Sequence, residues 1–333
     1  MTEHTEAEAA TDVEGWQPDA ALGGAFQART LPLGADPFGE VVATLVRLPA
    51  TVTPVRGALL LVHGFADYFF HAELATALAG LGFDVYAIDL RRYGRSLRPG
   101  QLPNFVTDMH VHFEELDDAV ELIRAESAGR RLVVFGHSTG GLITALWAHA
   151  RRTEGIIDGL VLNSPWLDLA EPWPTRVLGS PVIELVGRLK PTYVIRPALG
   201  TAYGEGLHRD YHGEWDYRFE WKPLEAVAVR AGWLAAVRRG HREVHRGLAI
   251  SAPVLVMHSS RSLLHQTVWT EASMRADTVL DVDQIHRWAA KLAPEPDVVV
   301  IPDGMHDLFL SAKPVRAKAL AEVTAWLDTH LPA

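Results

Sequence analysis

The sequence predicts an α/β protein with a mostly parallel central sheet, helices flanking that sheet, and a mainly helical segment inserted late in the chain. Two observations support this prediction. Short apolar runs alternate with helical patterns over the first half of the chain, which is typical of strands joined by crossover helices. The alternation then stops after Pro165 for roughly eighty residues before a buried strand resumes it. In such sheets ligands bind at the carboxyl ends of the strands.

The predicted elements follow one another in a regular order. Each strand is a short run of apolar and β-branched residues, and each helix repeats its apolar residues on a helical period. The predicted strands are residues 26–33, 40–48, 58–62, 83–90, 131–135, 160–163, 252–258 and 297–301. The predicted helices are residues 72–81, 109–128, 142–147 and 314–331. The first two strands precede the alternation and form an opening pair.

The interruption is rich in Trp, Tyr and Pro and contains only short helical patches, so we interpret it as a cap over the sheet. At the N-terminus, an acidic stretch precedes the first basic residue, Arg29, and indicates a solvated, mobile tail. The predicted parts are therefore a tail (1–22), one α/β domain (23–165 and 248–333) and a cap (166–247).

The composition is that of an ordinary globular chain, with 48% hydrophobic residues among 333. A formal charge of -10 argues against a nucleic-acid partner, because phosphate binding needs clustered Lys and Arg. The N-terminus is acidic where a signal peptide is basic, and no apolar stretch reaches about 18 residues, so we expect a cytoplasmic protein without stable membrane insertion. The sequence contains no cysteine, which excludes thiolate metal sites, and it contains no nucleotide-binding glycine motif. We expect no cofactor and no metal. The oligomeric state stays open.

One serine lies where a strand, a sharp turn and a helix meet. Gly136, Ser138 and Gly140 match the G-x-S-x-G pattern of a nucleophile elbow, in which flanking glycines let the serine occupy a strained backbone conformation. The strain holds the Ser138 hydroxyl clear of the sheet. It also leaves the backbone N–H of Thr139 at a helix N-terminus, where developing negative charge is stabilised. Ser138 is therefore the candidate nucleophile.

A serine hydroxyl needs an imidazole to take its proton and a carboxylate to orient that imidazole. His306 follows the last predicted strand, at the carboxyl end of the sheet where Ser138 is also expected, so it is the candidate general base. Three aspartates between the last two strands are candidates for the acid, namely Asp277, Asp281 and Asp283. We favour Asp277, because Asp281 is also well placed to cap the helix that follows it. Asp281 stays the main alternative.

Ester hydrolysis passes through an oxyanion, which two backbone N–H groups stabilise. We expect the N–H of Thr139 to be one donor and the N–H of Phe65, directly after a predicted strand, to be the other. Neighbours of these groups are expected to line the substrate pocket, namely His63, Gly64, Tyr68, His137 and Trp166. Burial in a core explains the aromatic residues after Phe65 equally well.

Five motifs stand out together, namely HGF at 63–65, DLRRYGRS at 89–96, GHSTGG at 136–141, AD-x-x-x-D at 276–281 and GMHD at 304–307. In combination they resemble the monoglyceride lipase and serine aminopeptidase-like branch of the α/β-hydrolase superfamily. In that branch the acid is the Asp of AD-x-x-x-D, which matches Asp277. Two departures are a longer segment between His258 and Asp277, and Arg92 where the branch has glycine.

The resemblance implies an α/β-hydrolase fold and a serine hydrolase that cleaves carboxylic esters with an apolar acyl group, such as monoacylglycerols or lysophospholipids, without a cofactor. An aminopeptidase-like peptidase uses the same three groups but needs a cap carboxylate to bind a free amino terminus. The carboxylates available for that role are Glu205, Asp210, Glu214 and Asp216. A non-catalytic binding protein of this fold is the alternative from another class.

Overall fold

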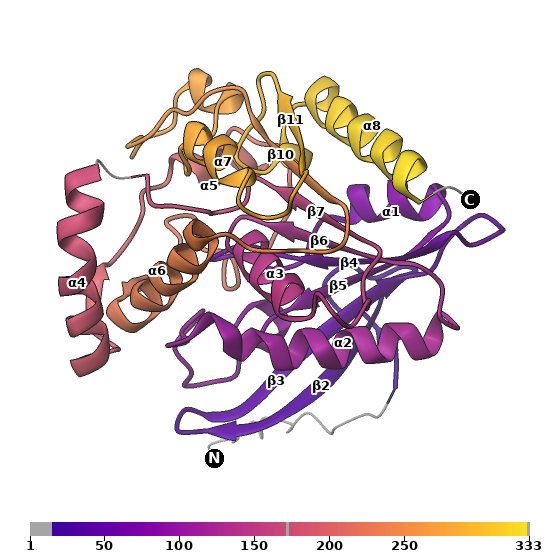
Figure 1. Ribbon diagram of the computed structural model, residues 1–333, viewed down its shortest axis with the longest axis horizontal. Helices are drawn as coiled ribbons and strands as arrows, with labels where there is room; N and C mark the ends of the chain where they lie inside the picture. Colours follow the sequence, from indigo (N-terminus) through magenta and orange to yellow (C-terminus); the bar gives the residue numbers. More distant parts are fainter. Residues whose placement is uncertain (1–14, 171–172, 332–333) are drawn as a thin grey trace, which may run out of the picture.

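The computed structural model describes residues 15–170 and 173–331 (Figure 1). Within these residues a nine-stranded sheet runs in the order β1-β2-β3-β5-β4-β6-β7-β10-β11. From β5 onward in this order every neighbouring pair is parallel. At the other edge, β1, β2 and β3 pair antiparallel, and β3 pairs antiparallel with β5. The predicted mostly parallel sheet is confirmed.

Each predicted strand is present, with ends that differ from the predicted ones by at most three residues. The strands of the sheet are β1 (Gln17–Pro18), β2 (Gln27–Asp36), β3 (Gly39–Leu48), β4 (Gly57–Val62), β5 (Phe83–Asp89), β6 (Leu132–His137), β7 (Gly159–Asn163), β10 (Val254–Ser259) and β11 (Asp297–Ile301). β1 was not predicted, because two residues are too few to show a period.

The predicted helices are also present. They are α1 (Ala72–Gly80), α2 (His112–Glu126), α3 (Thr139–Ala150) and α8 (Lys313–His330), and α7 (Val282–Ala289) lies between the last two strands. Short 3-10 turns are η1 (Gly94–Ser96), η2 (Met109–Val111), η3 (Glu271–Arg275) and η4 (Leu308–Leu310). The predicted helix 109–128 therefore starts as a 3-10 turn, in which the Asp108 side chain accepts the His110 N–H.

Helices cover both faces of the sheet, and each face has its own core (Figure 1). In β4, Leu59 and Leu61 pack on the face covered by α1 and α8, whereas Leu60 and Val62 pack on the face covered by α2 and α3. A strand that is buried on both faces has to be apolar throughout, which explains the continuous apolar run in this part of the sequence.

The predicted tail, residues 1–22, extends too far along the chain. Residues 1–14 lie outside the described residues, but residues 15–22 are folded onto the sheet. β1 pairs with β2, and the buried carboxylate of Asp19 accepts two hydrogen bonds from the Arg95 guanidinium, at 2.7 and 2.8 Å. The acidic composition suggested solvation because the partner, Arg95, is distant in the sequence.

The predicted cap contains α4 (Trp173–Leu189), β8 (Val194–Arg196), α5 (Ala202–Leu207), β9 (Val229–Arg230) and α6 (Ala231–Arg246). α4 stands beside α6 at the outer edge of the molecule (Figure 1). Its outer side exposes Val182, Leu185 and Leu189. None of the helices in the described part of the chain is long and apolar enough to cross a membrane.

Candidate active site

Ser138 lies at the turn between β6 and α3 with a φ of 54° and a ψ of −116°. This region of backbone space is costly for a residue with a side chain, so the surroundings must hold Ser138 in it. A Cβ at Gly136 would lie 2.3 Å from Thr144 Oγ1, and one at Gly140 would lie 2.3 Å from the carbonyl oxygen of His63. Glycine at both positions therefore lets β6, α3 and the end of β4 approach one another closely.

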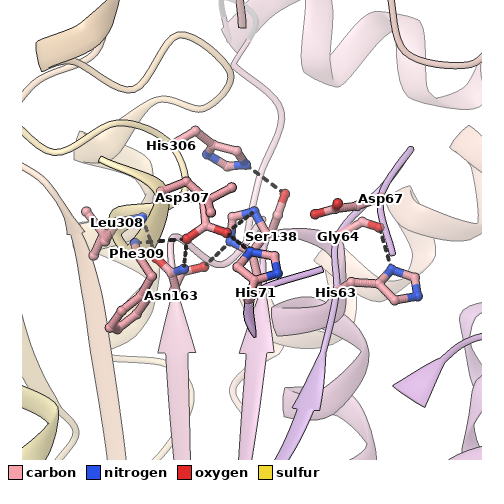
Figure 2. Close-up of polar contacts among 12 residues, drawn as sticks. His63, Gly64, Asp67, His71, Ser138, Asn163, His306, Asp307, Leu308 and Phe309 are labelled. Carbon is pink, nitrogen blue, oxygen red and sulfur yellow. Dashed lines mark hydrogen bonds and ion pairs between the residues drawn. The ribbon is translucent and has the colours of Figure 1, made fainter. Parts of the chain in front are cut away.

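His306 and Asp277 form a hydrogen-bonded chain that ends at Ser138. His306 Nε2 lies 3.0 Å from Ser138 Oγ (Figure 2), and His306 Nδ1 lies 2.8 Å from Asp277 Oδ2. Because an ionised carboxylate only accepts hydrogen bonds, Nδ1 carries the ring proton and Nε2 presents its lone pair to the hydroxyl. All three side chains are buried. This arrangement is suited to removing the Ser138 proton.

Asp277, and not Asp281, contacts His306. The second carboxylate oxygen of Asp277 accepts the backbone N–H groups two and three residues further along the chain, at 2.8 and 2.7 Å. Asp281 is the N-cap of α7, where its side chain accepts the backbone N–H two residues on. The two aspartates therefore have different structural surroundings, and only Asp277 lies within reach of the imidazole.

The long segment before Asp277 supports this aspartate instead of displacing it. The Asp277 N–H donates to the carbonyl oxygen of Arg261 at 3.0 Å, and the Leu263 N–H donates to the carbonyl oxygen of Asp277 at 2.7 Å. η3 lies within the same segment. Two backbone hydrogen bonds thus fix the backbone from which the Asp277 carboxylate points to His306.

Phe65 and Thr139, the expected oxyanion donors, each directly follow a residue at the nucleophile, namely Gly64 and Ser138. Gly64 approaches Ser138 so closely that a Cβ on Gly64 would lie 3.0 Å from Ser138 Cβ. Thr139 is the first residue of α3, so its N–H has no partner within the helix. In the described part of the chain neither N–H has a hydrogen-bond acceptor. Two unused donors beside a serine suit the stabilisation of an oxyanion.

Of the five residues expected in the substrate pocket, Gly64 and His137 lie next to each other, because a Cβ on Gly64 would lie 3.3 Å from the His137 ring. His63 and His137 also line a small cavity of about 30 Å³, and Gly64, Tyr68 and Trp166 are not among its lining residues. A cavity of this size holds a water molecule but no acyl chain. The two histidines instead hold backbone in place, because His63 Nε2 accepts the Leu90 N–H and His137 Nδ1 donates to a β7 carbonyl oxygen.

Tyr68 packs between the α/β domain and the cap. Its hydroxyl accepts the Arg218 N–H at 2.8 Å, and its ring meets the Trp221 ring edge-on at 5.0 Å between centroids. Tyr68 is almost completely buried. Core packing therefore accounts for this residue, as the alternative interpretation of the aromatic run predicted.

Trp166 contributes to an aromatic wall beside the elbow. The backbone N–H of Trp166 donates to the Ser138 carbonyl oxygen at 2.9 Å. Its ring lies 5.7 Å from the ring of Trp233 in α6, and Trp233 in turn lies 4.1 Å from the ring of Phe65. The cap thus contacts the residue that carries the second expected oxyanion donor.

A buried ion pair that the sequence did not predict joins the cap to the same loop. Lys222 Nζ lies 2.8 Å from Asp67 Oδ1, and both side chains are less than a tenth exposed. Burial alone would raise the pKa of Asp67, but Lys222 and His71 hold this pKa below its usual range. Nζ also faces the ring of Tyr203, whose edge meets the His306 ring. No local pattern links positions 67 and 222.

The turn after β5 fixes the other side of this loop. The buried carboxylate of Asp89 accepts the Phe69 N–H at 2.7 Å and the Arg95 N–H at 3.0 Å. A Cβ at Gly94 would lie 2.4 Å from that carboxylate. The DLRRYGRS motif at 89–96 therefore forms a turn with a structural role beside this loop.

Arg92 occupies a backbone conformation that suits the glycine found at this position in the motif that the sequence resembles. Its φ is 65°, in the left-handed region that favours glycine. The Arg92 guanidinium hydrogen-bonds to Asp36 and to the Phe105 carbonyl oxygen, which stabilises the strained backbone from outside the turn.

The cap carboxylates do not converge on the serine. Asp210 and Asp216 are 68% and 63% exposed, and Glu214 pairs with Arg316 of α8 at 2.6 Å. Among the interactions found between the described residues, none joins these groups or Glu205 to Ser138 or His306. An amine-binding carboxylate at the nucleophile is therefore not seen among these four.

Comparison with known proteins places these features in a family. A family model described as serine aminopeptidase, S33, matches residues 53–311. The chain is 31% identical to the monoglyceride lipase of Saccharomyces cerevisiae over 290 residues, which cover 83% of this chain and 86% of that protein. It is also 33% identical to human monoglyceride lipase over 140 residues, which cover 41% of this chain and 44% of that protein.

Solved structures are similar over nearly the whole chain. A soluble variant of monoglyceride lipase from Saccharomyces cerevisiae, in complex with a substrate analogue, matches with a TM-score of 0.70 and 20% identity over 91% of this chain and 96% of that chain. The monoacylglycerol lipase of Paleococcus ferrophilus matches with a TM-score of 0.62 and 22% identity, over 86% of this chain and 98% of that one. These likenesses show the α/β-hydrolase fold. The chain belongs to the serine aminopeptidase S33 family, in the monoglyceride lipase and lysophospholipase-like branch of the α/β-hydrolases.

Proposed function

We propose that the protein hydrolyses carboxylic esters through an acyl-enzyme on Ser138. The observation that carries this proposal is the continuous hydrogen-bonded chain from Ser138 through His306 to Asp277, at 3.0 and 2.8 Å. Nucleophile, base and orienting carboxylate already have the contacts that acyl transfer needs.

In the first half of the reaction, Ser138 Oγ attacks the ester carbonyl carbon while its proton moves to His306 Nε2. Asp277 stabilises the imidazolium that forms and keeps the ring oriented. The carbonyl oxygen becomes an oxyanion, which accepts hydrogen bonds from the N–H groups of Phe65 and Thr139. The tetrahedral intermediate then collapses, the C–O bond breaks, and His306 returns its proton to the departing alcohol.

In the second half, water attacks the acyl-enzyme. His306 removes a proton from this water as it attacks, and then protonates Ser138 Oγ as the carboxylic acid leaves. The same two N–H groups stabilise the second oxyanion. The sum of both halves is ester plus water giving alcohol plus carboxylic acid, so the residues named supply every proton transfer.

The substrate class we propose is a small lipid ester, such as a monoacylglycerol or a lysophospholipid. Relatives named monoglyceride lipase and lysophospholipase support it. The aromatic wall of Phe65, Trp166 and Trp233 supports an apolar acyl group, because such rings offer broad apolar contact beside the nucleophile.

A peptidase of the aminopeptidase kind is the second candidate, favoured by the description of the matching family. It requires a carboxylate that binds the free amino terminus of the substrate. The exposure of Asp210 and Asp216 and the pairing of Glu214 with Arg316 favour the ester reaction over this one.

Parallel turnover assays on p-nitrophenyl butyrate and on an aminoacyl p-nitroanilide test the ranking. We expect kcat/KM for the ester to exceed that for the anilide by at least tenfold. A faster anilide would reverse the ranking, and no turnover of either, together with no fluorophosphonate labelling, would favour the non-catalytic alternative.

A further inference from the structure

Asp307, directly after His306, is a buried carboxylate that the proposed reaction does not use. Its side chain hydrogen-bonds within a cluster of polar groups that includes Asn163 and His71 (Figure 2). Oδ1 accepts the Asn163 amide at 2.8 Å and the Phe309 N–H at 3.0 Å. Oδ2 accepts from His71 Nε2 at 2.8 Å. One carboxylate thus joins the loop that carries His306 to the end of β7 and to the start of α1.

Asn163 connects this carboxylate to the nucleophile. Its backbone carbonyl oxygen accepts the Ser138 N–H at 3.1 Å. Its side-chain amide donates to Asp307, and its side-chain oxygen accepts the Leu308 N–H at 3.3 Å. The backbone of Asn163 therefore holds the serine, while the side chain of the same residue holds the loop that carries the histidine.

The sheet order explains why such a link is needed. Ser138 follows β6 and His306 follows β11, and β7 and β10 lie between these two strands. Neighbouring strands are about 4.8 Å apart, so the His306 loop has to reach back across three spacings, or about 14 Å. Asn163 ends β7, which lies on this path next to β6.

A purely local role does not account for these contacts. Asp307 caps η4 by accepting the Phe309 N–H, and an exposed aspartate would do this equally well. The hydrogen bonds to Asn163 and His71 require a buried carboxylate, which is costly unless it is paired. Burial alone would raise the pKa of Asp307, but the neighbouring His137 and His71 hold this pKa well below its usual range, so the carboxylate is ionised at neutral pH.

We propose that Asn163 and Asp307 form a clamp that sets the distance between Ser138 Oγ and His306 Nε2. Both are positioning residues, because they act through the loop and the elbow without touching the reacting atoms. His71 hydrogen-bonds to Oδ2 of Asp307, the carboxylate oxygen that Asn163 does not contact. The expected change in kcat rests on the proposed function. The expected change in the distance between Ser138 and His306 rests on geometry alone.

Three variants test whether the hydrogen bonds of the clamp or the negative charge of Asp307 supports the reaction. Asp307→Ala removes all three hydrogen bonds, and Asn163→Ala removes the side-chain link but keeps the carbonyl oxygen that holds Ser138. We expect each to lower kcat for p-nitrophenyl butyrate about 100-fold, the typical cost of displacing a catalytic group by about 1 Å. KM should change by less than about threefold, since substrate binding is untouched. Asp307→Asn keeps an acceptor for Asn163 and should retain kcat within about tenfold of the unaltered protein.

The matched control is Asp84→Ala. Asp84 also accepts a backbone N–H and an Arg guanidinium, at 3.0 and 2.9 Å, but lies at the amino end of β5, at the opposite end of the strands from His306. We expect it to lose stability without losing kcat. All rates are measured per folded molecule, with the folded fraction taken from circular dichroism at the assay temperature.

A crystal structure of Asp307→Ala gives a readout that does not depend on activity. We expect the distance from Oγ to Nε2 to exceed the hydrogen-bond limit of about 3.5 Å. An unchanged distance, or a folded Asp307→Ala with kcat within about threefold of the unaltered protein, would overturn the clamp. If Asp307→Asn loses as much kcat as Asp307→Ala, the clamp is overturned, and the negative charge of Asp307 explains the effect instead. If Asp307→Ala does not fold, the same two measurements, kcat and the distance from Oγ to Nε2, are made on Asn163→Ala and judged by the same limits. An unaltered protein that turns over no ester contradicts the proposed function instead, and the distance still tests the clamp.

Discussion

His306 Nε2 lies 3.0 Å from Ser138 Oγ, although 168 positions separate the two residues in the chain. Both are nearly inaccessible to solvent, at 3% and 6% exposure. The contact is therefore built by the fold before any substrate binds, and the ring of Tyr203, from the predicted cap, meets the His306 ring edge-on. Each residue that holds this contact offers a separate test.

Asp277→Asn should lower kcat by about 10³- to 10⁴-fold, because an amide no longer fixes the imidazole tautomer or stabilises the imidazolium. Asp281→Ala is the matched control. It removes only the cap of α7, so we expect a loss of about 1 kcal/mol in the free energy of unfolding and unchanged kcat. Steady-state kinetics and urea unfolding measure the two effects, and the reverse pattern would move the acid to Asp281.

Lys222→Met should destabilise the protein by about 3–5 kcal/mol, because Asp67 is left as an unpaired buried charge. Adding Asp67→Leu should restore most of this loss, since the pair is then replaced by apolar groups. Arg209→Met is the control, because the Arg209–Asp216 pair is exposed and contributes at most about 1 kcal/mol. Urea unfolding of the unaltered protein, of Lys222→Met and Asp67→Leu alone, and of the double variant measures the coupling. Additive effects of the two buried substitutions would show that the pair does not act as a unit.

Gly140→Ala should deform the elbow, because its Cβ would lie 2.3 Å from the His63 carbonyl oxygen and 2.6 Å from that of Val62. Backbone cannot yield as a flexible side chain does, so we expect a loss of about 1–3 kcal/mol in stability. The rate of labelling by a fluorophosphonate should fall by about 100-fold. Gly80→Ala, with open space around it in α1, should change stability by less than about 1 kcal/mol. Equal effects of the two variants would contradict the packing argument.

Stability should fall as the pH is lowered from about 6.5 towards 4. Burial lowers the pKa of His137 to about 4, with a further contribution from His306. The unfolded chain has histidine pKa values near 6.5, so between these values it binds more protons than the folded chain. The stabilisation is complete above about pH 6.5 and amounts to about 3 kcal/mol for His137 at most. Burial also lowers the pKa values of His63, His241 and His258, which adds to the effect with the same sign.

Urea unfolding at pH 7.5 and 5.0 measures this dependence. His137→Asn keeps a donor for the Asn163 carbonyl oxygen but does not titrate, so its stability should change less between the two pH values. An equally steep dependence in this variant would assign the effect to the other buried histidines.

The sheet could be predicted because its strands carry their signal locally. β11 spans the predicted residues 297–301, and the apolar run of β4 reflects burial on both faces. The end of the tail could not be predicted, because the folding of residues 15–22 depends on Asp19 meeting Arg95. Composition records that a segment is acidic, but it does not record a distant partner.

The site shows the same division. Ser138 lies in a local turn motif, and His306 lies in a motif at a strand end, so both can be found from short stretches of sequence. Asp277 and Asp281 are the same residue type four positions apart, and only the path of the chain decides which one meets the imidazole. The local sequence therefore did not decide between them.

The pairs Asp67–Lys222 and Asn163–Asp307 join residues 155 and 144 positions apart. Residues of these types are usually exposed, so nothing in the local sequence marks them as buried partners. Among the residues expected in the pocket, Tyr68 contacts the predicted cap and His63 accepts a backbone hydrogen bond, and no local pattern reveals either contact.

Covalent labelling with a fluorophosphonate, followed by mass spectrometry of the peptides, tests the central claim most directly. We predict one adduct per chain, located on Ser138, and loss of both this adduct and at least about 10⁴-fold of the ester turnover in Ser138→Ala. An adduct on another residue, or full ester turnover by Ser138→Ala, would contradict the account.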